Sequence, residues 1–223
     1  MGQIYLVRHG QASFGSQDYD QLSPLGEQQA RWLGAYFAER GIRFERVVSG
    51  TQRRHRQSVQ CIHEGMAADQ LIEFDAGLNE FDFSELYQAA GGDRIVADGD
   101  LAQQRRAFFS RLKSVLHLWV QDQLPGKVTE SWVQFRQRVR DALQALQATA
   151  QGPLLIVSSG GPMGALVQQI LGAPDQAAIE LNLQIHNTGF CQLHFNEETL
   201  RLGSFNAIPH LDRPDRFHAI TSA

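Results

Sequence analysis

The sequence predicts an α/β fold: a three-layer α/β/α sandwich with a mostly parallel central sheet and a helical insertion over its pocket. Three observations lead to this fold class. Strand-like and helix-like segments alternate along the chain, which is the order of βαβ units. Residues 3–7 and 153–157 are short, continuous apolar runs, as expected of parallel strands buried on both faces. Residues 190–195 and 200–205 flank a polar turn and predict a hairpin.

The first half of the chain carries clear signals for where helices start and stop. After the first strand comes a polar, glycine-containing loop, and Ser23-Pro24 then supplies an N-cap followed by proline at the first helical position. Apolar residues at helical spacing continue this helix, and Gly41 is placed to end it. The next expected elements are a short strand, a basic helix and a third strand, at residues 46–49, 51–64 and 71–74.

The second half is expected to begin with a mostly helical insertion over residues 84–125. A further helix at about 129–150 carries an aromatic and aliphatic stripe, which is typical of a helix packed on a core. After the strand at 153–157, a glycine pair opens the next helix. Because 223 residues can bury one sizeable core, we interpret residues 1–223 as a single domain that contains the insertion.

Composition and charge argue against several classes of function. The net charge of −4 gives no electrostatic reason to expect nucleic acid. Cys61 and Cys191 are too few for a disulfide framework or a cysteine-rich metal site. The first residues run directly into a strand, and no stretch approaches 18 consecutive apolar residues. We therefore expect a cytoplasmic protein without nucleic-acid or membrane partners, and a homo-oligomer stays open.

The clearest chemistry lies in Arg8-His9-Gly10, at the carboxyl end of the first expected strand. In an α/β sheet, ligands bind in the crevice outside the strand ends. Arginine suits planar, bidentate capture of phosphate, and an imidazole beside it could attack phosphorus. The triplet thus indicates phosphoryl transfer through a phosphohistidine. The competing interpretation is a strand-end Arg-His pair without a chemical role.

Together with later segments, this triplet resembles the histidine phosphatase superfamily, also called phosphoglycerate-mutase-like. The similarity covers nearly the whole chain in the right order, and it implies the fold of that family. Weaker similarities are Glu130-Ser131 with Arg138-Val139, and Asn206 with His210-Leu211. The main segments that carry it are LVRHGQ at 6–11, LSPLGEQQA at 22–30, SGTQRRHRQS at 49–58 and LNEFDF at 78–83.

The resemblance implies a role for each of several residues. His9 matches the histidine that becomes transiently phosphorylated, Arg54 matches the pocket arginine that acts with Arg8, and Glu80 matches the acidic proton donor. Hydrogen-bond donors from Ser159, Gln11 and the backbone of Gly160-Gly161 are expected to complete the phosphate site. This chemistry requires no metal or other cofactor.

Structural roles compete with three of these assignments. Gly160-Gly161 could be only a tight strand-to-helix turn. Arg54 lies in the run Arg53-Arg54-His55-Arg56, and a charge run is usually a solvated helix face. Glu80 has nearby carboxylates that could equally be surface groups, namely Asp75, Asp82 and Glu85.

One position departs from the family's pattern. The family expects VSHGG after the late strand, whereas residues 157–161 read VSSGG, so that Ser159 stands where a second histidine belongs. A hydroxyl can hydrogen-bond a phosphate oxygen but brings no positive charge. Loss of one such donor typically costs about 10²–10³ in rate. A large gain in activity in Ser159→His would identify the missing imidazole as the limiting defect. Ordinary structural roles are expected of the remaining histidines, although His55 could lean toward the pocket and partly replace the missing cation.

Two functional hypotheses follow. The first is a phosphomonoester hydrolase of reduced or unusual efficiency, which acts on a small phosphorylated substrate through His9. The alternative is a degenerate relative that binds a phosphorylated ligand or partner without hydrolysing it. A phosphoglycerate-type mutase is less favoured, because residues 81–87 do not match the extended mutase pattern. A mixed apolar and basic lid over the pocket is expected from residues that include Phe81, Phe83, Arg94, Arg105 and Arg106.

Overall fold

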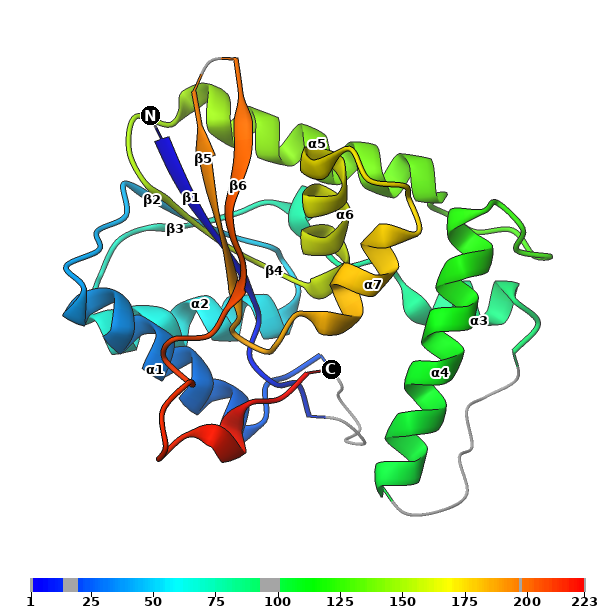
Figure 1. Ribbon diagram of the computed structural model, residues 1–223, viewed down its shortest axis with the longest axis horizontal. Coiled ribbons are helices and arrows are strands. Elements are labelled where there is room, and N and C mark those ends of the chain that lie inside the picture. The colour runs from blue at the N-terminus through cyan, green and yellow to red at the C-terminus, as the bar shows by residue number, and fades with distance from the viewer. Residues whose placement is uncertain (1, 14–19, 93–100, 197, 223) are drawn as a thin grey trace.

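A six-stranded sheet forms the centre of the computed structural model, which describes residues 2–13, 20–92, 101–196 and 198–222 (Figure 1). The strand order is β3-β2-β4-β1-β5-β6. Strands β1 to β4 pair in parallel, and β5 is antiparallel to both β1 and β6. The predicted α/β class with a mostly parallel sheet is therefore confirmed. The strands are β1 (Gly2–Arg8), β2 (Arg46–Ser49), β3 (Ile72–Phe74), β4 (Leu154–Ser158), β5 (Phe190–Phe195) and β6 (Leu200–Ala207).

Helices cover both faces of this sheet, as expected of a three-layer arrangement. Helices α1 and α2 lie on one face, and α5, α6 and α7 lie on the other (Figure 1). Alternate residues of β1 serve the two faces: Tyr5 and Val7 belong to the core beneath α1 and α2, whereas Ile4 and Leu6 belong to the opposite core. The helices are α1 (Pro24–Glu39), α2 (Arg53–Met66), α3 (Phe83–Ala89), α4 (Leu101–Val120), α5 (Trp132–Thr149), α6 (Gly160–Leu171) and α7 (Ala177–Gln184).

The helix ends follow from local sequence chemistry. The Ser23 hydroxyl accepts a hydrogen bond from the Gly26 N–H at 3.0 Å, and Gly41 beyond the end of α1 adopts a φ of +65°. Helix α5 opens with a capping box between Ser131 and Gln134. Helix α2 begins at Arg53, two residues later than expected, because Gln52 is extended. The sequence did not reveal α7, whose eight residues are too few for a clear helical period.

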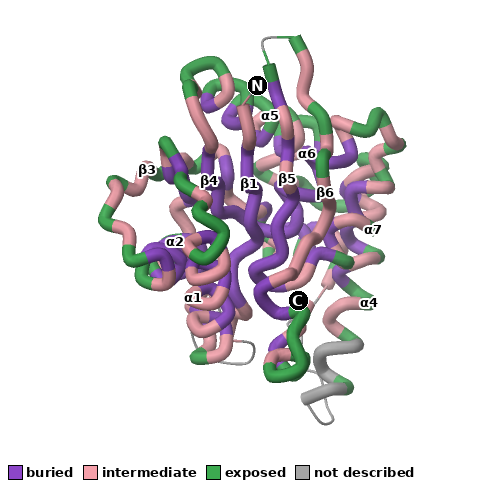
Figure 2. Tube along the Cα trace, turned by 60° about the vertical axis from the view of Figure 1, so that its left-hand side comes forward, coloured by how far each residue is buried: buried purple, intermediate pink, exposed green. Residues whose placement is uncertain are grey.

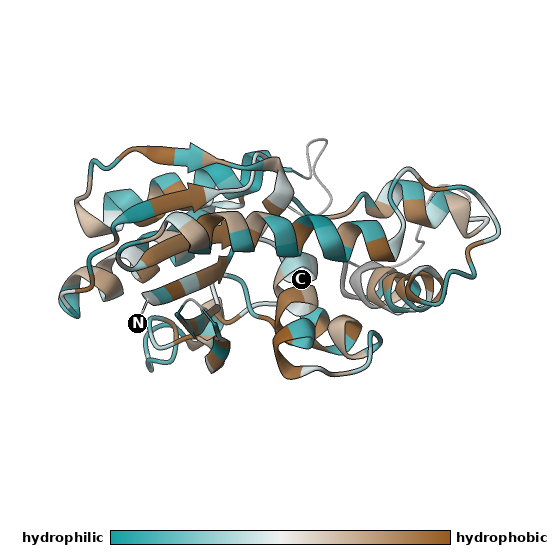
Figure 3. Cartoon of the chain, turned by 90° about the horizontal axis from the view of Figure 1, so that it is seen from above, coloured by the Kyte–Doolittle hydropathy of each residue, from teal (hydrophilic) through white to brown (hydrophobic). Residues whose placement is uncertain are grey.

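The expected helical insertion is present as α3 and α4. Seen from above, this pair stands at the right-hand end of the molecule, beside the layered sheet (Figure 3). It contacts the rest of the protein through aromatic side chains, and the ring centroids of Phe81 and Trp119 are 5.2 Å apart. The connection between the two helices includes Arg94, which lies outside the described residues, as do the side chains of Arg105 and Arg106.

Burial is deepest in the middle of the sheet. Strand β1 lies between β4 and β5, and these three strands are mostly buried along their length (Figure 2). The parallel register pairs Arg8 of β1 with Ser158 of β4, and Ser49 of β2 with Val157 of β4. The carboxyl ends of the three adjacent strands β2, β4 and β1 therefore lie side by side at the same end of the sheet. Within the described residues, no helix is both long and apolar enough to span a bilayer.

Candidate active site

Three chain segments meet where β1, β2 and β4 end. The backbone N–H of His9 donates to the Ser158 carbonyl at 2.9 Å, and that of Gly50 donates to the Val157 carbonyl at 3.0 Å. These bonds continue the parallel register beyond the strands. They place the residues that follow β1, β2 and β4 side by side, as the βαβ order predicts.

His9 is a buried histidine with a defined ring orientation. Its Nδ1 lies 2.7 Å from the Gly10 carbonyl oxygen, which can only accept, so Nδ1 carries the proton and Nε2 keeps its lone pair. Burial is the main cause that lowers the pKa of His9 well below its usual value, and the charges of Arg54 and Arg8 lower it further. The imidazole is therefore neutral and nucleophilic at neutral pH.

Gly10 serves packing rather than ligand binding. A Cβ at this position would lie 2.3 Å from the Gly26 carbonyl oxygen, so the chain can pass this closely over α1 only as glycine. The Gly10 N–H donates to the Ser58 hydroxyl at 3.0 Å. Together these contacts fix the loop that carries His9.

Two buried arginines flank His9. Nη1 of Arg8 donates to the Ile185 carbonyl at 2.5 Å. The Arg54 guanidinium donates to Asp20 at 2.6 Å and to Gln52 at 2.9 Å. Its neighbours on α2, Arg53 and Arg56, are exposed, so the charged run divides between a solvated face and the site. The solvated-face interpretation thus fits those neighbours but not Arg54.

Glu80 reaches the site from the segment between β3 and α3. Its carboxylate accepts hydrogen bonds from the N–H groups of Gly161 at 3.0 Å and Phe81 at 3.3 Å. Desolvation by the surrounding protein raises the pKa of Glu80, although these bonds and the arginine charges act in the opposite direction. A raised pKa keeps more of the carboxyl protonated, as a proton donor requires.

The three neighbouring carboxylates have structural roles instead. Asp75 caps the short 3₁₀ turn Ala76–Leu78, and Asp82 caps α3. Glu85 accepts from the backbone N–H of Thr129 at 2.7 Å. Of the four carboxylates considered in this stretch, Glu80 is the one that contacts the start of α6 beside His9.

The glycine pair at the start of α6 differs from expectation. The Gly161 N–H donates to Glu80, so it is engaged with the carboxylate rather than directed at a bound anion. A Cβ on Gly161 would lie 2.0 Å from Glu80 Oε1, and a Cβ on Gly160 would lie 2.2 Å from Asn182 Oδ1. Both glycines therefore make room for neighbouring polar side chains. The anion-binding role of the Gly160 backbone stays a prediction.

Ser159 and His55 contact each other at the floor of the site. Both are fully buried (0% exposed), and Ser159 Oγ lies 2.6 Å from His55 Nε2. The His55 ring centroid is 5.7 Å from that of His9. Burial lowers the pKa of His55 well below its usual value, with a further contribution from Arg54. His55 therefore does lean toward the pocket, but its ring is neutral at neutral pH and does not replace the missing cation.

Gln11 is held mainly by α1 and its cap. Its side-chain oxygen accepts from the Ser23 hydroxyl at 2.9 Å, and its backbone N–H donates to Gln29 at 2.9 Å. A role for Gln11 in anion binding stays a prediction.

Several supporting residues escaped the sequence-based site list. The Gln52 side-chain oxygen accepts from both the Arg54 guanidinium and the Glu80 backbone N–H, which links the two segments. Arg138 pairs with Glu130 and donates to the Asn79 carbonyl next to Glu80. The weak family similarity at Glu130 and Arg138 was the available sequence signal for that ion pair. Nothing in the sequence marked Gln52.

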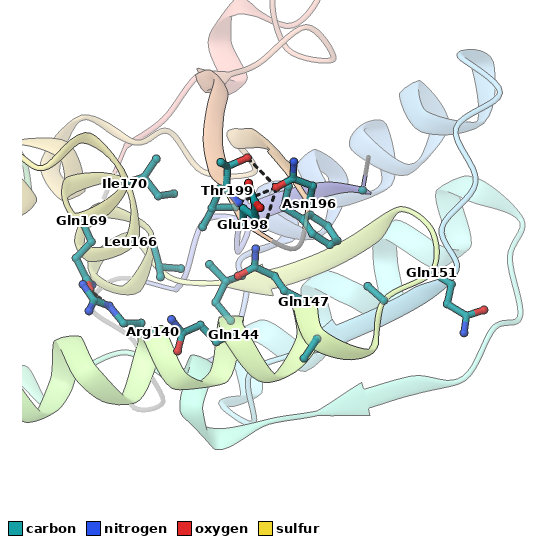
Figure 4. Close-up of a pocket in the computed structure, with 16 residues that line it drawn as sticks. Arg140, Gln144, Gln147, Gln151, Leu166, Gln169, Ile170, Asn196, Glu198 and Thr199 are labelled. Carbon is teal, nitrogen blue, oxygen red and sulfur yellow. Dashed lines mark hydrogen bonds between the residues drawn. The ribbon is translucent and has the colours of Figure 1, made fainter.

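A large groove elsewhere on the surface is separate from this site. It has a volume of about 1010 Å³ and lies between α5, α6 and the β5–β6 turn (Figure 4). Gly2 lines it, so it lies at the opposite end of β1 from His9. Arg140 in this groove donates to Gln169. In the described part of the chain, no three His, Cys, Asp or Glu side chains cluster in a way that could hold a metal ion.

The fold and the clustered side chains define an α/β protein with a buried cationic pocket around a neutral imidazole. The chain belongs to the histidine phosphatase superfamily (branch 1), whose family model matches residues 4–208. That match agrees with the resemblance carried by the sequence motifs.

Individual relatives agree with this family. The chain is 28% identical over 222 residues to a putative phosphoserine phosphatase 2 of Hydrogenobacter thermophilus, covering 94% of this chain and 98% of the relative. It is 29% identical over 229 residues to a probable phosphoglycerate mutase GpmB of Shigella dysenteriae, covering 96% and 97%. A phosphoserine phosphatase mutant from Entamoeba histolytica, solved with phosphoserine, superposes with a TM-score of 0.67 at 18% identity, covering 95% and 100%. That last similarity supports the fold.

Proposed function

We propose that this protein is a phosphomonoester hydrolase that acts through a phosphohistidine on His9. The observation that carries the proposal is the state of the His9 ring. Its Nδ1 proton is held by the Gly10 carbonyl, and its Nε2 lone pair lies in a pocket with two buried arginines and Glu80. Family membership supports phosphatase-type chemistry in general.

The first half of the reaction transfers the phosphoryl group to the protein. Arg8 and Arg54 hold the phosphoryl oxygens, and Arg54 exchanges its Asp20 carboxylate for the substrate. His9 Nε2 attacks phosphorus in line, an N–P bond forms, and the P–O bond to the leaving group breaks. Glu80 gives its proton to the leaving oxygen, which departs as the alcohol.

The second half returns the protein to its starting state. The Glu80 carboxylate takes a proton from a water molecule, and the water oxygen attacks phosphorus. The N–P bond breaks, and its electron pair returns to His9 Nε2 as inorganic phosphate leaves. Glu80 is protonated again, so atoms and charges balance over the cycle.

The substrate class is a small phosphorylated metabolite. This is supported by the names of two relatives, a putative phosphoserine phosphatase and a probable phosphoglycerate mutase, because both names refer to small phosphomonoesters. Hydrolysis is preferred to mutase chemistry because residues 81–87 lack the extended mutase pattern. Ser159 in place of the second histidine is the reason to expect reduced or unusual efficiency.

A binding protein without turnover is the second candidate. Ser159 favours it, because a hydroxyl brings no charge to a site that must stabilise a transferring phosphoryl group. The joint presence of His9 and Glu80 favours the hydrolase, since a binder needs neither a nucleophile nor an acid.

Incubation with a panel of activated and natural phosphomonoesters tests the proposal. We expect phosphate release, an acid-labile phosphoenzyme on rapid quench, and loss of both in His9→Ala. The exposed histidine substitution His218→Ala is the matched control and should keep both. If no ester yields phosphate or phosphoenzyme while inorganic phosphate still binds, the binding function replaces the hydrolase.

A further inference from the structure

We propose that His55 and Ser159 act as one unit, in which the His55 ring positions the Ser159 hydroxyl to donate to a phosphoryl oxygen. This inference rests on the proposed function, because it assigns a further donor to the same pocket. His55 is the positioning residue, and the Ser159 hydroxyl is the group that touches the substrate.

The backbone places Ser159 beside the nucleophile. The Ser158 carbonyl accepts the His9 backbone N–H, so Ser159, the first residue after β4, leaves the sheet alongside the His9 loop. The ring centroids of His9 and His55 lie 5.7 Å apart, and the Ser159 hydroxyl is hydrogen-bonded to the His55 ring. We therefore place the phosphoryl group that His9 attacks beside this pair; Ser159 is fully buried in the substrate-free protein, so the contact requires the site to open around its hydroxyl.

The ring environment determines which atom donates. Among the described residues, His55 Nδ1 has no hydrogen-bond partner, whereas Nε2 contacts Ser159. A buried N–H without an acceptor is rarer than an under-satisfied acceptor. The proton therefore sits on Nε2 and is donated to Ser159 Oγ. The hydroxyl proton of Ser159 is then directed away from the ring, toward the pocket.

Two positions, Ser159 itself and Gly50, are arranged in ways that allow this contact. Serine at a helix N-cap usually accepts a bond from the first turn, but the Ser159 side chain makes no such bond at the start of α6. Gly50 leaves the space that the ring fills, since a Cβ there would lie 2.2 Å from His55 Nδ1. Ser159 after β4, Gly50 after β2 and His55 on α2 thus fit against one another.

This unit supplies what a plain serine cannot. A hydroxyl that accepts from an imidazole N–H is polarised, and bonds in such a chain strengthen one another. Substrate oxygens that carry negative charge would draw the hydroxyl proton further toward them. Ser159 thereby becomes a stronger donor, although the residue that strengthens it comes from α2 rather than from the end of β4.

A mutant cycle measures the coupling. We expect His55→Ala and Ser159→Ala each to lower kcat by about 10²-fold, the typical loss of one preorganised donor. The double variant should be no slower than either single variant, because the two groups act together. Fully multiplicative losses would overturn the unit. Wild-type kcat and phosphate affinity in His55→Ala would also overturn it, and His218→Ala controls for loss of an unrelated imidazole.

Moving the imidazole from position 55 to position 159 distinguishes this proposal from the alternative that the site merely lacks a histidine at position 159. Ser159→His alone should not raise activity, because the new ring would collide with His55, whose Nε2 is already 2.6 Å from the serine oxygen. His55→Ala/Ser159→His has room for the new ring and should exceed both Ser159→His and His55→Ala by at least about 10-fold in kcat. A large gain in Ser159→His alone would contradict the proposal.

Two readouts keep the test independent of turnover, one on the wild-type protein and one on a variant that retains both side chains. Nitrogen NMR of the His55 ring should report the proton on Nε2, and added inorganic phosphate should shift the His55 signals. Gly50→Ala, which displaces the ring without removing it, should weaken phosphate binding as His55→Ala does. A proton on Nδ1, or no response to bound phosphate, would overturn the unit. If phosphate shifts His55 while no phosphoenzyme forms on His9, the hydrolase proposal fails and this one stands.

Discussion

Single residues at this site are explained by what lies next to them more than by their own chemical type. Gly161 is glycine because the Glu80 carboxylate occupies the space of its Cβ. Glu80 in turn is held by that residue's N–H, and its desolvation raises its pKa. A carboxyl with a raised pKa keeps its proton to a higher pH than an ordinary surface glutamate does, which favours donation to a leaving oxygen.

Glu80→Gln tests this acid. With alkyl phosphates, whose leaving groups need a proton, we expect kcat to fall by about 10²–10⁴-fold, the range of general acid catalysis. With an aryl phosphate such as p-nitrophenyl phosphate the loss should be much smaller. In the wild type, kcat for alkyl esters should fall as pH rises through the raised pKa of Glu80, and this alkaline decline should disappear in Glu80→Gln.

Asp82→Asn is the control for this substitution, since asparagine also caps a helix and Asp82 caps α3. Equal losses with alkyl and aryl esters in Glu80→Gln would argue that Glu80 positions the loop rather than donating a proton.

The sequence predicted which residues come together at the candidate site but not their contacts. Arg8, His9, Arg54 and Glu80 follow from strand ends and from family motifs, which depend on local order. The contact between His55 and Ser159 joins residues that are 104 positions apart. Nothing in either local pattern encodes it, because both serine at a strand-to-helix turn and histidine on a helix are ordinary.

Whole elements serve the site through their termini and through long side chains. Helix α5 lies far from His9 along the chain, yet its Arg138 donates to the carbonyls of Gly77 at 2.9 Å and Asn79 at 3.1 Å. The same guanidinium pairs with Glu130, just before the helix, at 2.6 Å. One side chain therefore fixes the segment that presents Glu80.

Arg138→Met should loosen that segment. We expect kcat to fall by about 10–100-fold, since a displacement near 1 Å at a catalytic group costs about that much. Phosphate affinity should change little, because Arg8 and Arg54 keep their places. Arg140→Met on the same helix is the matched control, as that exposed arginine donates only to Gln169 among the bonds described. A similar loss in both variants, or a loss of phosphate affinity instead of kcat, would contradict this role.

Element boundaries were predicted where capping chemistry is explicit and were shifted elsewhere. The starts of α1 and α6 followed from Ser23-Pro24 and from the glycine pair. Helix α5 begins at Trp132 rather than near residue 129, because Ser131 takes the N-cap. Tertiary packing decides such ends, and short helices such as α7 need that packing to exist at all.

The molecule as a whole buries an unusual set of neutral imidazoles. His9, His55, His63 and His210 are buried, and burial lowers the pKa of each, that of His210 to about 3. The unfolded chain binds protons on these rings below about pH 6.5, whereas the folded chain does not until the pH reaches the lower folded value. The free energy of unfolding should therefore fall as pH falls below about 6.5.

Urea unfolding between pH 7.5 and 5 in phosphate-free buffer measures this dependence. Each of these histidines should lower the free energy of unfolding by up to about 2 kcal/mol between pH 7.5 and pH 5. The raised pKa of Glu80 should offset part of this loss. His63→Leu should remove the contribution of one histidine, so the free energy of unfolding should fall less steeply with pH. The exposed-residue control His218→Gln should leave this slope unchanged. An unfolding free energy that is the same at pH 7 and pH 5.5 would contradict the prediction.

The central place of β1 also governs when the site can form during synthesis. Strand β1 carries Arg8 at its end and is synthesised well before both of its partners, because β4 and β5 come from beyond residue 150. At roughly 5–20 residues per second, about 150 residues take on the order of 7–30 s to emerge. Throughout that time β1 has no native partner on either edge. His9, the proposed nucleophile, is thus translated long before the strands that hold it in its working position.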